Sequence, residues 1–423
     1  MSTPRPWPPR PSPTEAARPV QPGEREPILD LLRGFALLGI LLVNIELMRG
    51  PALFDALTGT LPTPSGADRV TGFLVGWLAA GKFVSSFAIL FGVGGALLTA
   101  KAWQRGWSAH RLLGRRYALL AVFGLAHMVL LFPGDILFVY AVTGCALLPF
   151  LRVRPRTALG WSGGILLALT PVATGTAVLA TAVGGGSQDV AGGAFGGFLD
   201  QQRTTTIAAY TEGGIGEVLA ARSFEALVLQ TGQLVSLPWL LALFLLGFAA
   251  ARAGIVTEPA AFRPLLRRLA ALGLGVGLPT NLVLGLLGPV GTATGTAGEA
   301  TPTWVELASV PAQLLAAPLL AVGYLAALSL LALRFGTWRP LAAVGQMALT
   351  AYLSQSIVAT VVFVGWGTYG AWTATGAVVV VAGTWALLLL VCPLWLRWYR
   401  FGPVEWVWRS WTYRSRQPLR RAA

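Results

Sequence analysis

The chain has little charge and almost no cysteine or histidine for its length. Only 11% of its 423 residues are charged, whereas a soluble domain has about 25%. Its two cysteines, Cys145 and Cys392, both fall in apolar stretches, which argues against a disulfide framework or a cysteine metal motif. The two histidines form no HExxH pair. These absences exclude a disulfide-stapled fold and predict no metal site.

Apolar residues are abundant instead. They make up 55% of the chain, and the mean hydropathy is +0.67. Apolar runs of about 18 residues or more recur along the whole length, and each can cross the ~30 Å hydrocarbon core as a helix. We therefore expect an all-α, polytopic helical bundle in the lipid bilayer. About ten spans are expected, at roughly 29–48, 71–99, 116–132, 134–151, 158–183, 234–251, 267–290, 309–333, 340–364 and 373–396.

The positions of the basic residues predict the orientation. With the N-terminus inside the cell, 25 of the 31 Lys and Arg residues fall in cytoplasmic segments and four in outer segments. This asymmetry follows the positive-inside rule and predicts that both termini are cytoplasmic. The net charge of +14 is therefore a topology signal, and it requires no nucleic-acid partner.

The same pattern divides the chain into five segments. The Pro- and Arg-rich start is typical of a disordered tail, and tryptophans among arginines near the C-terminus are typical of the membrane surface. The segments are a disordered cytoplasmic tail at 1–27, a five-helix block at 28–183, an outer loop at 184–233 with a surface helix at 215–229, a second five-helix block at 234–396 and a basic, Trp-rich cytoplasmic tail at 397–423.

The first span carries an unusual polar stripe. Asp30, Arg33 and Asn44 fall on one face of a helix at ~100° per residue, and Asn44 lies about 16 Å beyond Arg33. An Asp–Arg pair in a membrane helix either fixes the packing of that helix or lines a site or pathway. Both interpretations stay open at this stage.

A histidine and an aspartate flank the tight turn after the third span. His127 lies near the outer end of that span, and Asp135 follows the turn at Leu131–Asp135. A histidine oriented by a carboxylate is a competent general base near neutral pH. The alternative is a histidine that only bonds a neighbouring helix.

Lys82 interrupts the second span, with Ser86 one turn further on the same face. A lysine at this depth needs an acid, a carbonyl group or a water-filled cavity, unless its stem reaches the outer surface. The acids expected on the outer side, and hence the candidate partners, are Asp135, Glu46 and Asp55.

The ninth span is rich in hydrogen-bonding side chains. Gln346 and Thr350 share one face, while Tyr352 and Gln355 lie on another. Such residues commonly bond membrane helices together. The alternative interpretation makes these four, with Lys82 and Ser86, the polar wall of a cavity.

Several segments together resemble the YeiB-like bacterial membrane proteins, whose second half is a domain of unknown function. The match covers nearly everything after residue 25. The segments are Asp-x-x-Arg-Gly-Phe-Ala-Leu-Leu-Gly-Ile at 30–40, Phe-x-x-Leu-Phe-Gly at 87–92, Gly-Asp-Ile-Leu-x-x-Tyr at 134–140, Gly-x-Met-Ala-Leu-Thr-x-Tyr-Leu-x-Gln-Ser at 345–356 and Gly-Pro-x-Glu-Trp-x-Trp-Arg at 402–409.

That family is grouped with transmembrane acyltransferases. The resemblance implies a multi-pass protein of the bacterial plasma membrane, with an acyl-CoA such as acetyl-CoA as cytoplasmic donor and an acceptor across the membrane. Asp30, Arg33 and Asn44 match the first-helix pattern by spacing. The chain departs from the O-acyltransferases of this group, which carry His where it has Asn44. It also departs from the lysosomal heparan glucosaminide N-acetyltransferase, whose catalytic His lies in the first outer loop, because residues 49–70 contain no His.

The first functional hypothesis is acyl transfer to an unknown small-molecule or glycan hydroxyl or amine. His127 would be the base and Asp135 would orient it. The first-span stripe would bind the donor together with Arg115 and Arg116, which alternatively are ordinary positive-inside charge.

The second hypothesis is a transporter for a small polar solute or lipid-linked intermediate, gated by Lys82 with Asp135. A scaffold or sensor that uses the outer loop is the third. The sequence leaves the acceptor, the acyl length and the oligomeric state open.

Overall fold

The computed structural model describes residues 26–58, 65–182, 193–287 and 303–421, and nearly every element in them is a helix. This confirms the all-α class; the tail predicted at 1–27 lies almost wholly outside the described residues. The elements are α1 (Pro27–Arg49), α2 (Ala52–Thr58), α3 (Gly66–Leu78), α4 (Lys82–Gln104), α5 (Ala109–Leu130), α6 (Leu137–Leu147), the 3₁₀ segment η2 (Leu148–Arg152), α7 (Pro155–Ala182), α9 (Ala194–Thr211), α10 (Ile215–Val235), α11 (Leu237–Arg252), α12 (Arg263–Gly275), α13 (Gly277–Leu287), α14 (Thr303–Phe335), α15 (Arg339–Gln346), α16 (Ala348–Ala359), the π-helical segment η3 (Thr360–Gly365), α17 (Ala374–Trp398) and α18 (Pro403–Tyr413).

The number of membrane spans differs from the expected ten. Among the described residues, eight helical stretches are long and apolar enough to cross a membrane, or up to nine if the bent pair α10 and α11 counts as one span. The segment expected at 134–151 forms a shorter apolar helix, Leu137–Arg152, and α11 is bent by 59° from α10. The chain is an all-α, multi-pass membrane protein.

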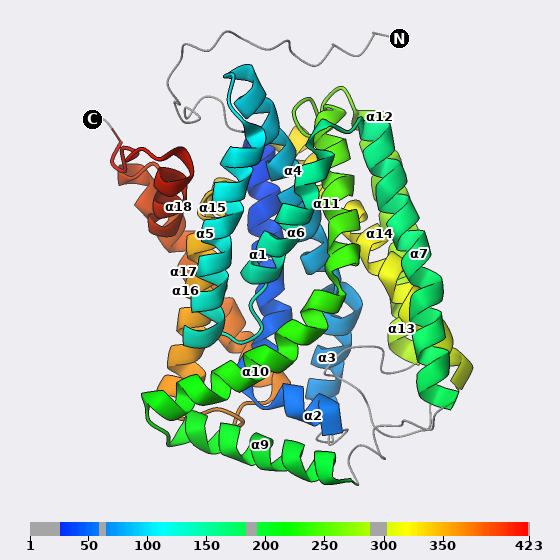
Figure 1. The fold of residues 1–423 in the computed structure, drawn as a ribbon, viewed down its shortest axis with the longest axis vertical. Helices are drawn as coiled ribbons and strands as arrows, with labels where there is room; N and C mark the ends of the chain where they lie inside the picture. The colour runs from blue at the N-terminus through cyan, green and yellow to red at the C-terminus, as the bar shows by residue number, and fades with distance from the viewer. Residues whose placement is uncertain (1–25, 59–64, 183–192, 288–302, 422–423) are drawn as a thin grey trace.

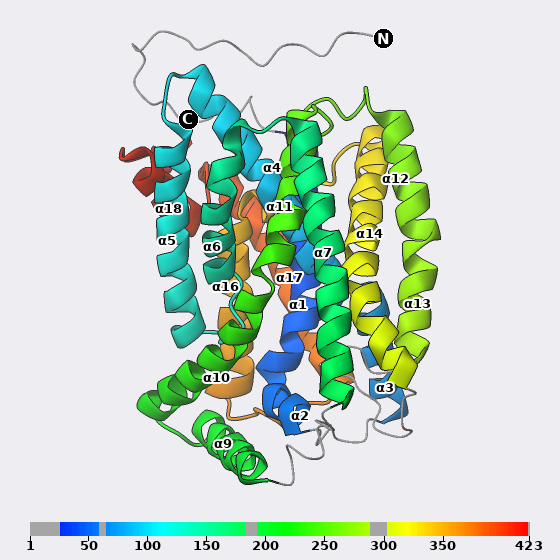
Figure 2. The same cartoon turned by 45° about the vertical axis from the view of Figure 1, so that its right-hand side comes forward.

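The long helices run side by side, and the two ends of the bundle differ (Figures 1 and 2). We call one end the α18 end, because α18 lies there, close to where α1 begins. The opposite end is the α9 end, which α9 and α10 cross. The basic connections at 105–116 and 252–268 lie at the α18 end. On the charge argument, this is the end expected to face the cytoplasm.

Three helix crossings depend on glycine. Where α4 crosses α11, a Cβ at Gly92 would lie 2.0 Å from the carbonyl oxygen of Phe244, and a Cβ at Gly247 would lie 1.8 Å from that of Ile89. The crossings of α1 with α15 and of α12 with α14 have the same close approach, at Gly34 with Gly345 and at Gly273 with Gly323. In a membrane, where lipid tails are as apolar as leucine, such backbone contact is a main source of helix association.

The two expected five-helix blocks pack against each other. From the second block, α11 lies against α4 and α7, and α15 and α17 lie against α1 of the first block. One hydrophobic core accordingly includes residues from Leu29 to Trp408. The polar groups that face this core therefore come from distant parts of the chain.

The interval at 184–233 contains two helices where one was expected. The predicted surface helix is α10, which extends to Val235, and α9 precedes it. Figure 2 shows α10 crossing below the turn between α5 and α6. Arg222 of α10 donates to the carbonyl oxygen of Leu130, and Gln230 Nε2 donates to that of Asp135 at 2.8 Å. The turn is therefore covered by α10, not exposed as an outer hairpin.

We expect Gly247→Ala to destabilise the bundle. The added methyl group would meet the backbone carbonyl of Ile89, which cannot move without separating α4 from α11. Overpacking of this kind costs about 1–3 kcal/mol, which a thermal unfolding scan in detergent would detect as a lower midpoint. Gly164→Ala in α7 is the matched control, because nothing lies within 4 Å of its Cβ position. Equal midpoints for the two variants would contradict the crossing as a stability determinant.

Candidate functional site

A cavity of about 340 Å³ lies toward the α18 end, between α1, α4, α5, α6, α16 and α18. Its interior is mainly apolar and aromatic. Its wall includes the rings of Phe87, Phe91, Tyr117, Tyr140 and Tyr352, and those of Phe401, Trp408 and Tyr413 near α18. Helix α18 forms part of the wall and is held against α5, since Trp408 Nε1 donates to the carbonyl oxygen of Arg116 at 2.8 Å.

Positive charge gathers in the cavity wall, at Arg33, Lys101, Arg116 and Arg409. Arg33 pairs with Asp30, 3.3 Å between Nη1 and Oδ1. The guanidinium of Arg116 instead stacks on Trp408, with Cζ 3.5 Å from the ring centre. Among the described residues, no carboxylate forms an ion pair with Arg116 or Arg409. Burial lowers the pKa of Arg409, while the nearby Tyr413 and Glu405 oppose this shift. The wall holds these four cations and three acids, Glu26, Asp30 and Glu405, and this small positive excess favours an anionic ligand.

One acid of the wall, Glu405, caps a helix and also attracts the Arg409 cation. Its Oε1 accepts hydrogen bonds from the backbone N–H groups of Leu349 at 2.6 Å and Thr350 at 2.9 Å, in the first turn of α16. The hydroxyl of Thr350 donates to Oε2. Burial raises the pKa of Glu405, while these hydrogen bonds oppose the rise. A carboxylate at a helix N-terminus is favourable, so Glu405 fixes α18 to α16.

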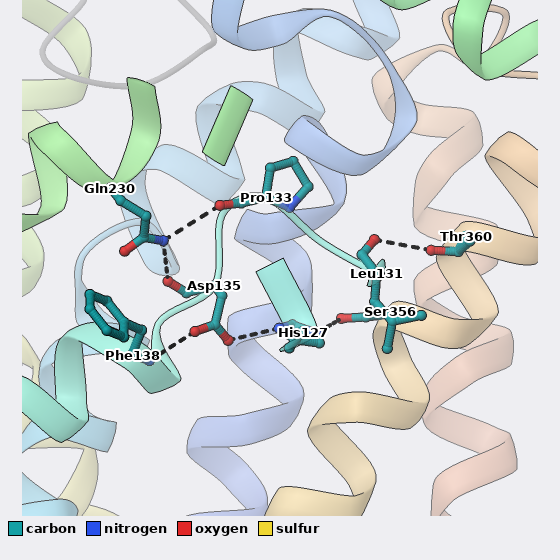
Figure 3. Close-up of polar contacts among 8 residues, drawn as sticks. All are labelled: His127, Leu131, Pro133, Asp135, Phe138, Gln230, Ser356 and Thr360. Carbon is teal, nitrogen blue, oxygen red and sulfur yellow. Dashed lines mark hydrogen bonds and ion pairs between the residues drawn. The ribbon is translucent and has the colours of Figure 1, made fainter. Parts of the chain in front are cut away.

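Beyond the cavity, His127 forms hydrogen bonds through both ring nitrogens (Figure 3). Its Nδ1 lies 2.7 Å from Oδ1 of Asp135, as the sequence predicted, and its Nε2 lies 2.9 Å from Oγ of Ser356. All three side chains are buried. They come from α5, from the turn before α6 and from α16, so only the folded chain brings them together.

Asp135 has hydrogen-bond partners at both carboxylate oxygens and at its carbonyl oxygen. Its second oxygen, Oδ2, accepts from the backbone N–H of Phe138 at 2.8 Å, and its carbonyl oxygen accepts from Gln230. Gly124 of α5 allows the approach, because a Cβ there would lie 2.4 Å from the nitrogen of Phe138 and 2.8 Å from Oδ2 of Asp135. The carboxylate is therefore positioned before any ligand binds.

Tyr352 connects the cavity with the buried group. It lines the cavity, and its ring centre lies 5.0 Å from that of His127. It also precedes Ser356 by one turn of α16. Ile136, the residue after Asp135, lies in the cavity wall as well. The inner end of the cavity therefore lies against the His127 group, which is outside the wall itself.

The structure brings together three of the five residues predicted to bind the donor. Asp30, Arg33 and Arg116 line the cavity. Asn44 lies three turns further along α1, and Arg115 lines a separate depression with residues of α18. The predicted stripe therefore continues past the cavity.

The predicted polar cavity residues are also divided. Gln346 and Tyr352 lie in the wall. Gln355 instead donates to the carbonyl oxygen of Leu37 at 3.3 Å and bonds α16 to α1, which agrees with the helix-association interpretation. The predicted residues outside this wall are Lys82, Ser86, Thr350 and Gln355.

The prediction that one of three acids is the partner of Lys82 is wrong. Its Nζ donates to the carbonyl oxygen of Gly76 at 2.7 Å. Lys82 begins α4 directly after the turn that follows α3, so its stem reaches back to the last turn of α3. The three acids have other partners: Asp135 has His127, Asp55 has Arg203 and Glu46 has Arg49.

Sequence reasoning missed the contribution of α18 and the role of Ser356 in the buried group. The segment that ends in Trp408 and Arg409 was noted only for its resemblance and for interfacial tryptophans. The sequence signal that could have indicated a helix packed against the bundle is an acid, Glu405, among the aromatic residues of this segment. Ser356 stands one turn after Tyr352 in the polar ninth span, but no sequence spacing relates it to His127.

The comparisons with known proteins agree with the predicted resemblance. The family described as "Protein of unknown function (DUF418)" matches residues 250–415. The uncharacterized protein YxaH of Bacillus subtilis is 30% identical to this chain over 95% of it and 98% of YxaH. The uncharacterized protein YeiB of Escherichia coli is 29% identical over 93% of this chain and 98% of YeiB. An uncharacterized 39.9 kDa protein in the amylase 3' region of Bacillus acidopullulyticus is 27% identical over 95% and 97%, respectively.

These similarities cover nearly the whole chain. One hydrophobic core likewise includes residues from both halves of the chain. The chain belongs to the YeiB-like family of multi-pass membrane proteins, which carries the DUF418 domain of unknown function.

Proposed function

We propose that this protein is a membrane acyltransferase that takes an acyl group from an acyl-CoA at the α18 end. The acceptor is a hydroxyl or amine compound. The observation that carries the proposal is the arginine-lined cavity whose inner end lies against His127 and Asp135. The proposal puts an anionic donor and a general base at the two ends of one path.

The cavity chemistry supports a donor with phosphate groups and an apolar arm. Guanidinium groups bind phosphate oxygens with two parallel hydrogen bonds, and Arg116 and Arg409 have no competing carboxylate ion pair in the described part of the chain. The deeper wall of Phe87, Phe91 and Tyr140 suits a thioester arm with a small acyl group. A volume of about 340 Å³ accommodates such an arm and leaves the nucleotide at the α18 end.

His127 supports the chemical step. Acyl transfer requires a base that removes a proton from the attacking hydroxyl or amine. Asp135 orients the imidazole through Nδ1, which directs Nε2 away from the carboxylate as an acceptor. On the charge argument the donor enters from the cytoplasm, and the acceptor reaches His127 from the α9 end.

The transport alternative has less support. It requires Lys82 and Asp135 to act together as a gate, but each has a different partner, Gly76 and His127. Solute flux that is independent of acyl-CoA would favour it.

Arginine substitutions in the cavity should weaken donor binding. We expect Arg116→Gln or Arg409→Gln to raise the Kd for acetyl-CoA about ten- to a hundredfold, because a hydrogen bond to a charged group contributes about 1.5–3 kcal/mol. Isothermal titration calorimetry of the purified protein in detergent measures this.

Arg115→Gln is the control for this measurement, since Arg115 neighbours Arg116 on α5 but lines the other depression. Equal losses in all three variants would indicate a general charge effect. No binding of acetyl-CoA to the unmodified protein at millimolar concentration would contradict the donor assignment.

Removal of the base should abolish transfer. We expect His127→Ala to bring CoA release in membranes containing the native acceptor to background, while acetyl-CoA binding is kept. His110→Ala is the matched control, because His110 is the other histidine and is exposed in the first turn of α5. Full transfer by His127→Ala would exclude His127 as the base.

A further inference from the structure

We propose that Ser356 is a nucleophile that becomes acylated, so that the acyl group passes through a covalent acyl-serine. The proposal rests on the proposed function for the identity of the acyl donor. Asp135, His127 and Ser356 form the hydrogen-bonded sequence of an Asp–His–Ser triad, with contacts of 2.7 Å and 2.9 Å (Figure 3). Triads of this kind occur on unrelated folds and are recognised by geometry.

In the neutral imidazole that a general base requires, each contact has one direction. Nδ1–H donates to the carboxylate of Asp135, and the lone pair of Nε2 then faces Ser356. The hydroxyl of Ser356 then donates to Nε2. A base oriented by a third group and bonded to a hydroxyl is the arrangement that activates serine for attack. The first hydroxyl that His127 can deprotonate therefore belongs to the protein.

Three other buried serines form a different kind of contact. Ser85 donates to the carbonyl oxygen of Gly81, Ser162 to that of Ala242 and Ser329 to that of Leu325. Such bonds only satisfy the hydroxyl and hold helices. In the described part of the chain, Ser356 is the buried serine whose hydroxyl meets a histidine nitrogen.

The backbone and the hydrogen bonds around Ser356 have features that are typical of functional sites. The π-helical segment η3 begins four residues later at Thr360, and π-helical turns inside helices frequently occur at functional sites. Thr360 donates to the carbonyl oxygen of Leu131 at 3.1 Å, and Arg222 donates to the Thr360 hydroxyl at 3.2 Å. These bonds join the end of α16 to the turn before α6. They thereby help to fix the distance from Ser356 to His127.

A covalent intermediate also fits the position of the group. It lies between the inner end of the cavity, at Tyr352, and the turn that α10 covers. With all three side chains buried, the donor and the acceptor would have to reach one enclosed point. An acyl-serine removes the need for both to be present at once, because the donor leaves before the acceptor arrives.

The reaction balances without a further reactant. Ser356 Oγ attacks the thioester carbonyl carbon while its proton passes to His127 Nε2. The C–S bond then breaks, and that proton leaves with the sulfur as the CoA thiol. In the second half, an acceptor hydroxyl or amine gives its proton to Nε2 and attacks the acyl-serine. The C–O bond to Ser356 breaks, and Oγ regains the proton.

The test is to trap the acyl group. The full-length protein in detergent is mixed with radiolabelled acetyl-CoA, quenched in acid and mapped by peptide mass spectrometry. We expect acetyl on Ser356, and its absence in Ser356→Ala and His127→Ala. We also expect CoA release by Ser356→Ala to fall by about a hundredfold or more, as for other lost nucleophiles. Ser162→Ala is the control and should keep both the adduct and the release.

The outcomes separate this inference from the proposed function. If Ser356→Ala releases CoA as fast as the unmodified protein, Ser356 is no nucleophile, although the acyltransferase proposal stands. If the unmodified protein releases no CoA even in membranes containing the native acceptor, acyl-CoA is not the donor, and a fluorophosphonate probe decides about Ser356. Labelling of Ser356 that requires His127 would then support a nucleophile with another acyl donor. No labelling would overturn the inference. Mapping on the unmodified protein needs no variant, so a folding defect in Ser356→Ala does not affect it.

Discussion

The structure depends on one constraint. Because hydrocarbon offers no hydrogen bonds, a polar group inside the bundle needs a partner within the protein. Asp135 illustrates the result, with partners at both carboxylate oxygens and at its carbonyl oxygen. Lys82 and Gln355 meet the same need through the carbonyl groups of Gly76 and Leu37. Polar residues in the spans therefore divide into those that join helices and those that face the cavity or the buried group.

Close backbone approach makes these contacts possible. Glycine at the crossings of α4 with α11 and of α1 with α15 lets helices from the two halves of the chain meet. Gly124 does the same at the turn before α6, where it admits Asp135 and Phe138. The cavity forms where these crossings leave space, and α18 completes its wall through the bonds of Glu405 to α16. The tryptophans and arginines of α18 thus serve a docked helix as well as a membrane surface.

The cavity and the buried group have complementary chemistry. The first is positive toward the α18 end and apolar within, and the second is a hydrogen-bonded line of a carboxylate, an imidazole and a hydroxyl. Tyr352 touches both. This arrangement accounts for polar residues in several spans that separately look like ordinary helix-joining positions. It also explains why the predicted donor residues are divided, because Asn44 and Arg115 lie beyond the reach of the cavity.

The sequence by itself determined the fold class, the apolar segments and the basic end, and it permitted a contact between His127 and Asp135. These follow from local patterns, since hydropathy, charge and an eight-residue separation across a tight turn all act over short range. Only the tertiary structure decided the partner of Lys82, the docking of α18 and the contact of Ser356 with His127, which are 229 residues apart. Such pairings depend on which helices meet, and that choice is made by backbone fit at the glycine crossings, which hydropathy does not record.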